Sequence, residues 1–205
     1  MKRAAAGDSR MLKSRMRTGL RALVLAIGFA IGSVGSYGAI LLATGNVHTV
    51  VDGVLYRSAQ LNKSQFATVI RQHGIKSILN LRGGHPSDAW YADEIEVSKA
   101  FGVTHFDYPI SARRRVTSAQ IADILSIVRS APKPLLVHCR SGADRSGLVA
   151  ALFLLDAEHA DPAEADRQLS LLYGHFPYLL SKSVAMDESF WEFAGLSGIP
   201  SVAGR

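Results

Sequence analysis

The sequence predicts an α/β domain, with a central mixed or largely parallel sheet flanked by helices, that follows one apolar helix. Two observations carry this prediction. From residue 54 onward, short β-rich runs alternate with helical segments, as they do where helices cross over a sheet. Before that point, residues 22–43 form an uncharged apolar run. The 205 residues suffice for one ordinary domain, and the single cysteine excludes an intramolecular disulfide.

The excess positive charge lies in a basic N-terminal tail, residues 1–21. The whole chain carries 23 basic and 17 acidic side chains, of which seven basic and one acidic lie in this tail. The remaining residues therefore carry no net charge. The domain lacks the basic surface expected of a nucleic-acid-binding protein, so we expect no nucleic-acid partner.

The apolar run at 22–43 has the length and composition of a transmembrane anchor. No charged residue occurs between Arg21 and Asp52. Twenty-two helical residues span roughly 33 Å at ~1.5 Å each, enough to cross the hydrocarbon core of a bilayer. A cleaved signal peptide and a buried core helix are the alternatives. The apolar region of a signal peptide is usually about 7–15 residues long, and a core helix rarely follows seven cations.

The distribution of cations predicts how this anchor is oriented. Seven cations precede the span, so the positive-inside rule places the N-terminus in the cytoplasm. The domain that follows, residues 47–205, is then expected on the extracytoplasmic side, the periplasm in a Gram-negative cell. Gly28, Gly32 and Ser36 are spaced by four residues, which would let two anchors pack closely as a dimer.

Turn and capping signals delimit the elements of the domain after a short linker at 44–48. Gly74 and Gly102 predict the ends of two helices, and Thr117 or Ser118 the start of a third. Asp161, followed by proline and by Glu164, predicts the start of a further helix. The predicted strands lie near residues 54–59, 76–82, 103–110 and 134–138, and the predicted helices at 64–74, 88–102, 117–130, 146–159, from 161 onward, and at 183–194.

The segment VHCRSGADRSG, residues 137–147, lies between a buried strand and an apolar helix, where open α/β sheets bind ligands. Gly142 and Gly147 permit a tight turn. Inward-facing backbone N–H groups at a helix N-terminus make a site for a tetrahedral oxyanion. The same field would lower the pKa of the Cys139 thiol and give a thiolate nucleophile. Arg145 adds a planar fork that can bind two phosphate oxygens.

The pattern His138-Cys139-x5-Arg145-Ser146 resembles the signature of the cysteine-dependent protein tyrosine phosphatase superfamily, and the compact chain resembles its dual-specificity branch. The resemblance covers about residues 47–194. It implies a dual-specificity-phosphatase-like fold and hydrolysis of a phosphorylated substrate through a phosphocysteine intermediate. It also implies a mechanism without a metal or another cofactor.

The resemblance assigns a role to each residue of the signature. Cys139 is the nucleophile, and Arg145 binds the phosphate. His138 organises hydrogen bonds beneath the loop, and Ser146 donates to the Cys139 sulfur. The residues implied to surround the phosphate are Arg140, Ser141, Gly142, Ala143, Asp144 and Arg145.

The general acid departs from the main pattern of the family. Dual-specificity phosphatases carry this Asp on a loop that corresponds here to residues 109–118, which contain no carboxylate. Asp144 lies inside the signature loop, where myotubularin-like lipid phosphatases and some bacterial phosphatases have Gly-x-Asp-Arg and are thought to use the Asp as the acid. Asp107, just upstream of the carboxylate-free loop, is the second candidate. A site without a dedicated acid is the third alternative.

Four arginines are candidate substrate contacts. Arg113, Arg114 and Arg115 stand where the acid loop would be, and either favour a polyanionic substrate or are solvated turn residues. Arg82, at the end of a predicted strand, either contacts phosphate or forms a structural ion pair. The histidines show no metal-ligand spacing, so we expect no metal site.

Three functions remain open at this point. The first is a membrane-anchored phosphatase acting on phosphotyrosine, phospholipid or envelope-glycan phosphates. The second is a catalytically silent phosphate-binding module, against which the intact Cys139 and Arg145 argue. The third is a sulfur- or arsenate-handling enzyme on a similar loop, disfavoured because low-molecular-weight phosphatases and arsenate reductases carry that loop near the start of the domain.

Overall fold

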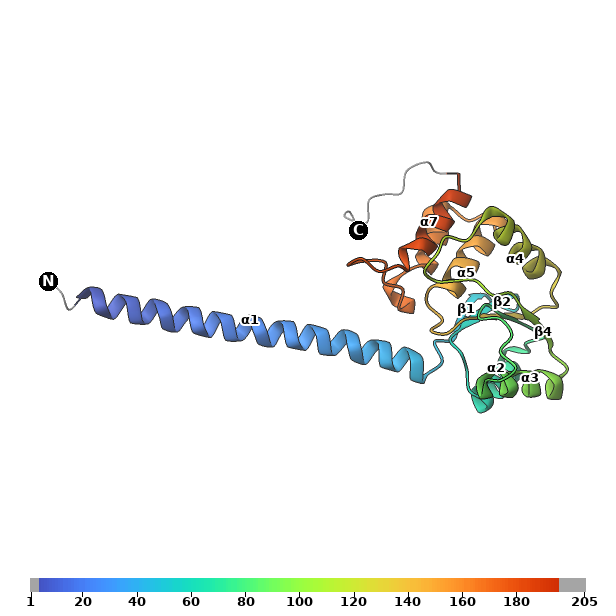
Figure 1. Ribbon diagram of the computed structural model, residues 1–205, viewed down its shortest axis with the longest axis horizontal. Coiled ribbons are helices and arrows are strands. Elements are labelled where there is room, and N and C mark those ends of the chain that lie inside the picture. Colours follow the sequence, from blue (N-terminus) through green and yellow to red (C-terminus); the bar gives the residue numbers. More distant parts are fainter. Residues whose placement is uncertain (1–3, 196–205) are drawn as a thin grey trace. The chain divides into compact units, whose positions relative to one another are not determined.

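The computed structural model describes residues 4–195, except the side chains of residues 4–18, 22, 30 and 31 (Figure 1). The first residues of the basic tail and the last ten residues of the predicted domain therefore lie outside the described residues. The chain divides into two compact units, residues 1–40 and 41–205, and each is described by itself.

The first unit belongs to one continuous helix, α1 (Ala4–Ala43). Residues 19–43 of this helix are long and apolar enough to cross a membrane, judged by length and composition. Most large apolar side chains of this segment are exposed, including Leu25 and Phe29. The helix runs through both the basic tail and the apolar run, without a break at residue 21.

The second unit is built on a five-stranded sheet in the order β1-β2-β5-β3-β4. The prediction of a mixed sheet is confirmed, because β1 is antiparallel to β2 and all other neighbours are parallel. Strand β1 was not predicted: it begins at His48, where the sequence analysis placed the end of a linker. The strands are β1 (His48–Val51), β2 (Leu55–Ser58), β3 (Ser77–Asn80), β4 (Thr104–Asp107) and β5 (Leu135–His138).

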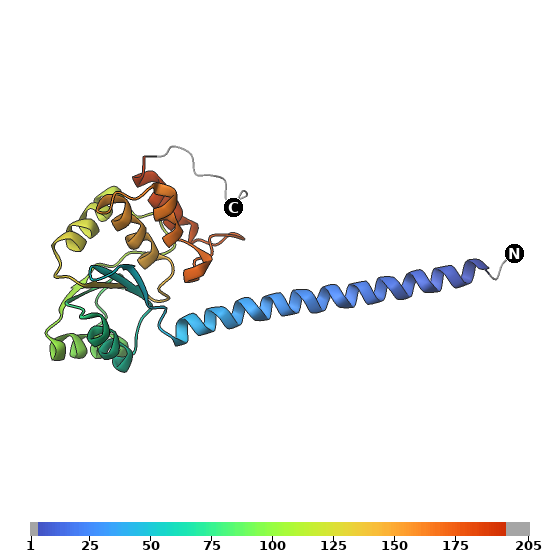
Figure 2. The same ribbon diagram turned by 180° about the vertical axis from the view of Figure 1, so that it is seen from behind.

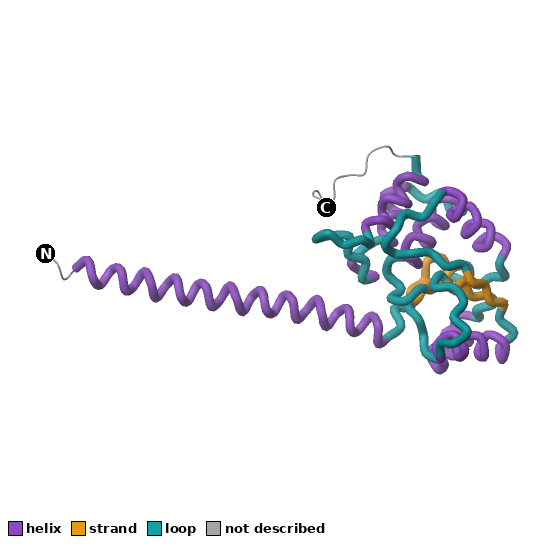
Figure 3. The backbone as a smooth tube through the Cα atoms, viewed as in Figure 1, coloured by secondary structure: helices purple, strands orange, loops and turns teal. Residues whose placement is uncertain are grey.

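Helices cover both faces of the sheet, with α2 and α3 on one face and α4, α5 and α7 on the other (Figures 1 and 2). Figure 3 shows the strands between these two groups of helices. The sequence analysis predicted each of these helices. Their bounds are α2 (Lys63–His73), α3 (Ala89–Phe101), α4 (Ser118–Ser130), α5 (Arg145–Asp156), α6 (Pro162–Ala165) and α7 (Val184–Phe193).

The capping signals explain most of these bounds. Asn62 and Thr117 begin α2 and α4 with capping boxes, in which each side chain accepts from a backbone N–H three residues later. Gly74 and Gly102 end α2 and α3 in the left-handed conformation. Asp161 caps α6 as predicted, but this helix ends after one turn and gives way to two short 3₁₀ turns, at residues 166–168 and 171–173.

The core divides in two because side chains alternate across the strands. In β5, Leu135 and Val137 pack with α4, α5 and α7, whereas Leu136 packs with α2 and α3. Strand β5 is buried along its whole length, as expected for a central parallel strand. The parallel register pairs the last residues of three strands, so the loops after them meet at one edge of the sheet: Asn80, Asp107 and His138.

Candidate active site

The signature loop joins the end of β5 to the start of α5 at that carboxyl edge. Cys139 follows β5 directly and is buried, with its Sγ 3.5 Å from the Ser146 Oγ. Burial raises the pKa of the Cys139 thiol, but the Arg145 guanidinium, the Ser146 hydroxyl and the backbone N–H groups of Ser146 and Gly142 lower it by more. The pKa is therefore below its ordinary value, which favours a thiolate.

Four consecutive carbonyls of the loop are held by donors outside it. On the other side of the loop, the backbone N–H groups of Gly142 and Ser146 bond to the Cys139 Sγ, and inward-facing N–H groups of this kind can form a cradle for an anion. Within the segment predicted to bind phosphate, the Arg140 side chain is exposed to solvent. The four carbonyls and their donors are Arg140 with Gln60 N, Ser141 with Asn46 Nδ2, and Gly142 and Ala143 with Arg57 Nη2.

Gly142 is required by its surroundings. Its φ of 72° lies in the left-handed region, and a Cβ atom there would stand 2.6 Å from the Ala59 backbone N. The two nearest atoms are backbone atoms of Ala59 and of Ser58 at the end of β2, so they cannot move aside. Any side chain at this position would push the loop away from the sheet.

Arg57 lies beneath the loop and was not predicted as a site residue. It is fully buried in β2, and its Nη2 donates to the carbonyls of Gly142 and Ala143 at 2.7 and 2.9 Å. Burial lowers its pKa to about 10, and the nearby Cys139, Tyr173 and Asp144 oppose this change, so Arg57 is a cation at neutral pH. The signal in the sequence was a lone arginine inside a predicted strand. The structure buries every residue of that strand.

Arg145 begins α5, and one part of its guanidinium is already bound. Nη1 donates to the carbonyls of Leu81 and Ile110, at 3.0 and 3.2 Å. Nε is buried and has no hydrogen-bond partner among the residues that the structure describes. A buried donor without a partner is unfavourable, and an oxyanion in the cradle could supply the missing acceptor.

His138 is held from below by a carboxylate that the sequence analysis missed. Glu94 of α3 is fully buried, and its Oε1 accepts from Nε2 of His138 at 2.8 Å and from Nε2 of His105 at 2.7 Å. Burial raises the pKa of Glu94, but His138, His105 and Gln60 lower it by more, so the net pKa lies below the ordinary range. The only sequence signal was an acidic residue at a core-facing helix position.

Asp144 lies at the start of α5 and faces a pocket of ≈ 560 Å³ that Arg113 and Lys182 also line. Its Oδ1 is 2.7 Å from Nδ1 of His175, and Nε2 of His175 is 2.9 Å from Oδ2 of Asp187. Burial lowers the pKa of His175, but the two carboxylates raise it by more, so that the net pKa is about 9. Neither His175 nor Asp187 was predicted to belong to the site.

Asp107 ends β4, as predicted, and both of its carboxylate oxygens are engaged. Oδ1 accepts from Asn80 Nδ2 at 2.8 Å, and Oδ2 accepts from the Tyr91 hydroxyl. Burial raises the pKa of Tyr91, and the bond to Asp107 adds to this effect, so that the pKa reaches about 12. Asp107 therefore joins β4 to β3 and α3.

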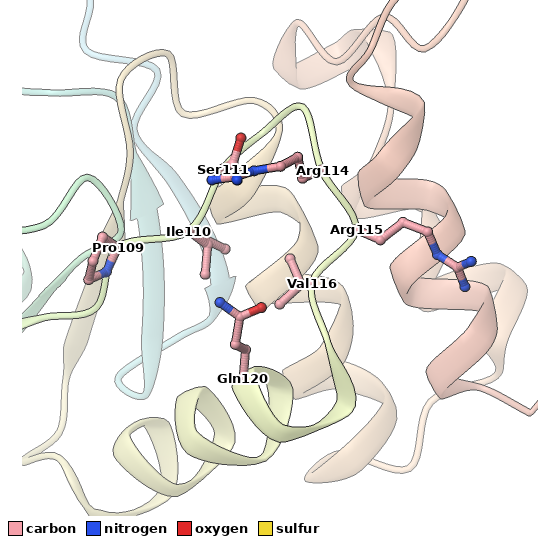
Figure 4. A pocket seen from close by; sticks show the side chains of 7 residues that line it. All are labelled: Pro109, Ile110, Ser111, Arg114, Arg115, Val116 and Gln120. Carbon is pink, nitrogen blue, oxygen red and sulfur yellow. The ribbon is translucent and has the colours of Figure 1, made fainter.

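The four candidate arginines occupy different environments. Arg113 lines the pocket of Asp144. Arg114 and Arg115 line a second pocket of ≈ 440 Å³ beside Ile110, and Figure 4 shows the end of the Arg115 side chain reaching toward α7, where it pairs with Glu192. Arg82 donates to Gln60 Oε1 at 2.8 Å, and its guanidinium lies 3.4 Å from the centre of the Trp90 ring.

These contacts distinguish the roles of the four arginines that were predicted to contact the substrate. Arg115 is the structural ion pair of the set, because it joins the 109–118 loop to α7. Burial lowers the pKa of Arg82, and the like charges of Arg145 and Arg140 lower it further, so Arg82 belongs to the electropositive surroundings of the signature loop. Within the described residues no group of three or more His, Cys, Asp or Glu side chains is arranged to bind a metal ion.

Several solved structures are similar to this chain in fold. TpbA of P. aeruginosa shares 22% identity with a TM-score of 0.54, over 73% of this chain and 91% of TpbA. The core catalytic domain of SIW14, a PP-IP phosphatase from S. cerevisiae, shares 21% identity with a TM-score of 0.56, over 73% of this chain and 91% of that domain. No curated protein matches the chain in sequence.

A family model gives the assignment. The model described as the tyrosine phosphatase family matches residues 36–163, which is more than half of the chain and includes the whole signature loop. The structural neighbours have the same type of α/β domain, and the loop at the carboxyl edge has a buried thiol of lowered pKa beside an arginine. The chain therefore belongs to the tyrosine phosphatase family.

Proposed function

We propose that this phosphatase hydrolyses phosphomonoesters through a phosphocysteine intermediate on Cys139. The observation that carries the proposal is the pairing of a buried thiol of lowered pKa with the unpartnered Nε of Arg145, on one backbone cradle. A phosphoryl group bound there would satisfy Arg145 and meet the sulfur. Intact Cys139 and Arg145 argue against a silent phosphate-binding module.

In the first step the Cys139 thiolate attacks phosphorus, and the bond from phosphorus to the leaving oxygen breaks. Arg145 binds two phosphoryl oxygens as charge moves onto them. Asp144, which lines the pocket and contacts His175 through Oδ1, gives its proton to the leaving oxygen. Asp107 is the weaker candidate for this role because both of its oxygens are already hydrogen-bonded inside the fold.

In the second step a water molecule attacks the phosphocysteine, and inorganic phosphate and the thiolate are released. The Asp144 carboxylate accepts the proton of the water and so returns to its protonated state. Ser146 donates a hydrogen bond to the departing sulfur, since its Oγ lies 3.5 Å away. His138, tied to Glu94, orients the backbone beneath the loop. No metal or other cofactor takes part in these steps.

We further propose that the chain has three parts: a basic tail at 1–21, a membrane anchor at 22–43 and a catalytic domain at 47–205. The length and composition of residues 19–43 support the anchor, and the cations before them support a periplasmic or other extracytoplasmic domain. Pairing of two anchors through Gly28, Gly32 and Ser36 is part of this proposal.

The proposed substrates are phosphotyrosine-type, phospholipid or envelope-glycan phosphates. A TpbA variant has been solved with phosphotyrosine, and SIW14 is a phosphatase of PP-IP compounds. Arg113 and Lys182 line the Asp144 pocket and would favour substrates with further negative charge. Arg82 would act through the field at the loop rather than by direct contact, since its guanidinium is already bound to Gln60 and stacked on Trp90.

The test is a comparison of Cys139→Ser and Arg145→Lys with the unchanged chain. Cys139→Ser should abolish hydrolysis of an aryl phosphate while vanadate still binds, because the cradle is made of backbone. Arg145→Lys should also lose activity, since a point charge cannot replace a planar fork. Turnover by Cys139→Ser close to that of the unchanged chain would exclude the phosphocysteine intermediate.

A further inference from the structure

A buried histidine lies between two carboxylates that belong to different elements. His175 follows the second 3₁₀ turn and is fully buried. Its Nδ1 contacts Asp144 at the start of α5, and its Nε2 contacts Asp187 in α7, at 2.7 and 2.9 Å. The proposed phosphatase chemistry uses Asp144 but assigns nothing to His175 or Asp187.

The geometry restricts where protons can lie in this cluster. Both ring nitrogens face an oxygen, so two N–H donors are needed if both carboxylates are ionised, and the ring is then an imidazolium. If the ring is neutral, one of the two carboxyl groups must be protonated: either Asp144 donates to Nδ1, or Asp187 donates to Nε2 while Nδ1–H donates to Asp144. In each case one proton occupies the contact between Asp144 and Nδ1. Charged groups near the cluster include Arg57 beneath the loop, and Arg113 and Lys182 in the pocket.

We propose that His175 is a positioning residue for Asp144: it holds Oδ1 so that Oδ2 faces the substrate, and its positive charge stabilises the carboxylate formed when Asp144 gives up its proton. This inference rests on the proposed function, in which Asp144 is the acid. Asp187 acts one step further away, because its carboxylate fixes the orientation of the ring and favours its charged form. The raised pKa of His175 agrees with an imidazolium at neutral pH.

This arrangement has two effects on catalysis. A carboxylate anchored at one oxygen loses rotational freedom, so the other oxygen is held where the leaving group departs. A fixed cation next to the new carboxylate lowers the energy of the state after proton transfer. Both effects matter most when the leaving group needs a full proton, as an alkoxide does, and least for an activated aryl oxide.

The experiment compares His175→Gln, Asp187→Asn, Asp144→Asn and the double variant Asp144→Asn/His175→Gln in the detergent-solubilised full chain. The substrates are an alkyl phosphate and p-nitrophenyl phosphate. His175→Gln should lower kcat on the alkyl phosphate about tenfold, with little change in KM and a smaller loss on the aryl phosphate. Its alkaline limb should move to higher pH, because the ionised Asp144 loses its cation. Asp187→Asn should act in the same direction, by less.

The double variant separates positioning from structure. If His175 acts through Asp144, adding His175→Gln to Asp144→Asn should cost no further activity. A full additional tenfold loss in that background, or equal losses on both substrates, would overturn the proposal. Vanadate affinity reports on the cradle and should not change. His159→Gln, at an exposed histidine after α5, is the matched control. If His175→Gln does not fold, Asp187→Asn tests the same prediction while the imidazole stays in place.

Failure of this inference differs from failure of the proposed function. If Asp144→Asn itself shows no dependence on the leaving group, the acid assignment fails. If Asp144→Asn shows that dependence and neither His175→Gln nor Asp187→Asn does, only the positioning role of His175 fails.

Discussion

The two carboxylates considered for the role of acid lie in contrasting surroundings. Asp107 ends a strand and is bound at both oxygens, by Asn80 and by Tyr91, so that it joins three elements of the fold. Asp144 begins a helix and is bound at one oxygen, by His175, and the residue lines an open pocket. A carboxylate that has to release and regain a proton needs an oxygen free to reach the substrate. The number of oxygens already engaged therefore favours Asp144 over Asp107 as the proposed acid.

The histidine contacts of the two regions also differ. His105 approaches Asp107 only to 3.8 Å and gives its close contact to Glu94, at 2.7 Å. His175 gives both of its nitrogens to carboxylates, one of which is Asp144 itself. His105 thus contacts Glu94, the carboxylate that holds His138 at the loop, whereas His175 contacts the candidate acid itself.

The largest expected effect tests the comparison directly. Asp144→Asn should slow hydrolysis of an alkyl phosphate by ~10²–10⁴-fold, the usual size of general-acid assistance, and slow an aryl phosphate far less. Asp107→Asn should change the two rates about equally, because this substitution removes contacts that hold the fold and does not affect the proton transfer. Steady-state kinetics on both substrates checks this, and a leaving-group dependence confined to Asp107→Asn would reverse the assignment.

The next effect is on stability and sharpens the account of His175. Its pKa of about 9 lies above the ordinary 6.5, so its contacts stabilise the fold fully below about pH 6.5, and this contribution is lost as the pH rises through about 9. The shift corresponds to about 3 kcal/mol. His175→Asn should therefore lower Tm by roughly 6–12 °C near pH 6, and by clearly less near pH 9.5. Scanning calorimetry at both pH values measures this, and a difference in Tm that does not change with pH would contradict it.

A smaller effect tests the hydrogen bond between Asp107 and Tyr91. The pKa of Tyr91 is raised to about 12 first by burial and then by the bond to the Asp107 carboxylate. Asp107→Asn removes the negative charge, so the pKa of Tyr91 should fall toward its ordinary value. Absorbance titration measures this, with Tyr91→Phe to identify the signal. Asp144→Asn should leave the Tyr91 titration unchanged, and an equal shift there would mean that the two regions are coupled.

The smallest effects concern the arginines of the 109–118 loop. Arg113→Ala should raise KM for a substrate with several phosphates, since this residue lines the Asp144 pocket. Arg115→Ala should leave KM unchanged, because its side chain is exposed and paired with Glu192, a contact worth less than about 1 kcal/mol. Kinetics with singly and multiply phosphorylated substrates separates the two. A KM effect of Arg115→Ala equal to that of Arg113→Ala would show that the ion pair opens to admit substrate.

Local signals in the sequence predicted most of the fold. The alternation of apolar runs, the helix-ending glycines Gly74 and Gly102, and the caps at Thr117 and Asp161 are properties of neighbouring residues. Strand β1 was missed because its residues do not alternate between buried and exposed: one is solvent-exposed and none is fully buried. Its place in the sheet depends on pairing with β2. The short length of α6 could not be foreseen either, since the path of the chain after Asp161 depends on packing against α5.

The site was predictable only where it is contiguous. The anion loop and its cysteine and arginine lie within ten residues, so their spacing carries the chemistry. Arg57, Glu94 and His175 reach the loop from 31 to 86 residues away in the sequence. Their contribution depends on the crossing order β2-β5-β3 and on the position of the last turns, neither of which leaves a local pattern.

Asn46 has a mechanical consequence. It is buried only three residues after the last residue of α1, and its Nδ2 donates to the carbonyls of Ser141 and Tyr173, while the Gly45 carbonyl accepts from Ala59. A pulling force applied along the chain from its N-terminal side would therefore meet the Gln65 side chain at Ala43 and the Ala59 backbone at Gly45, and then the Asn46 amide. Through that amide the tension would pass directly to the signature loop and to the turn before His175.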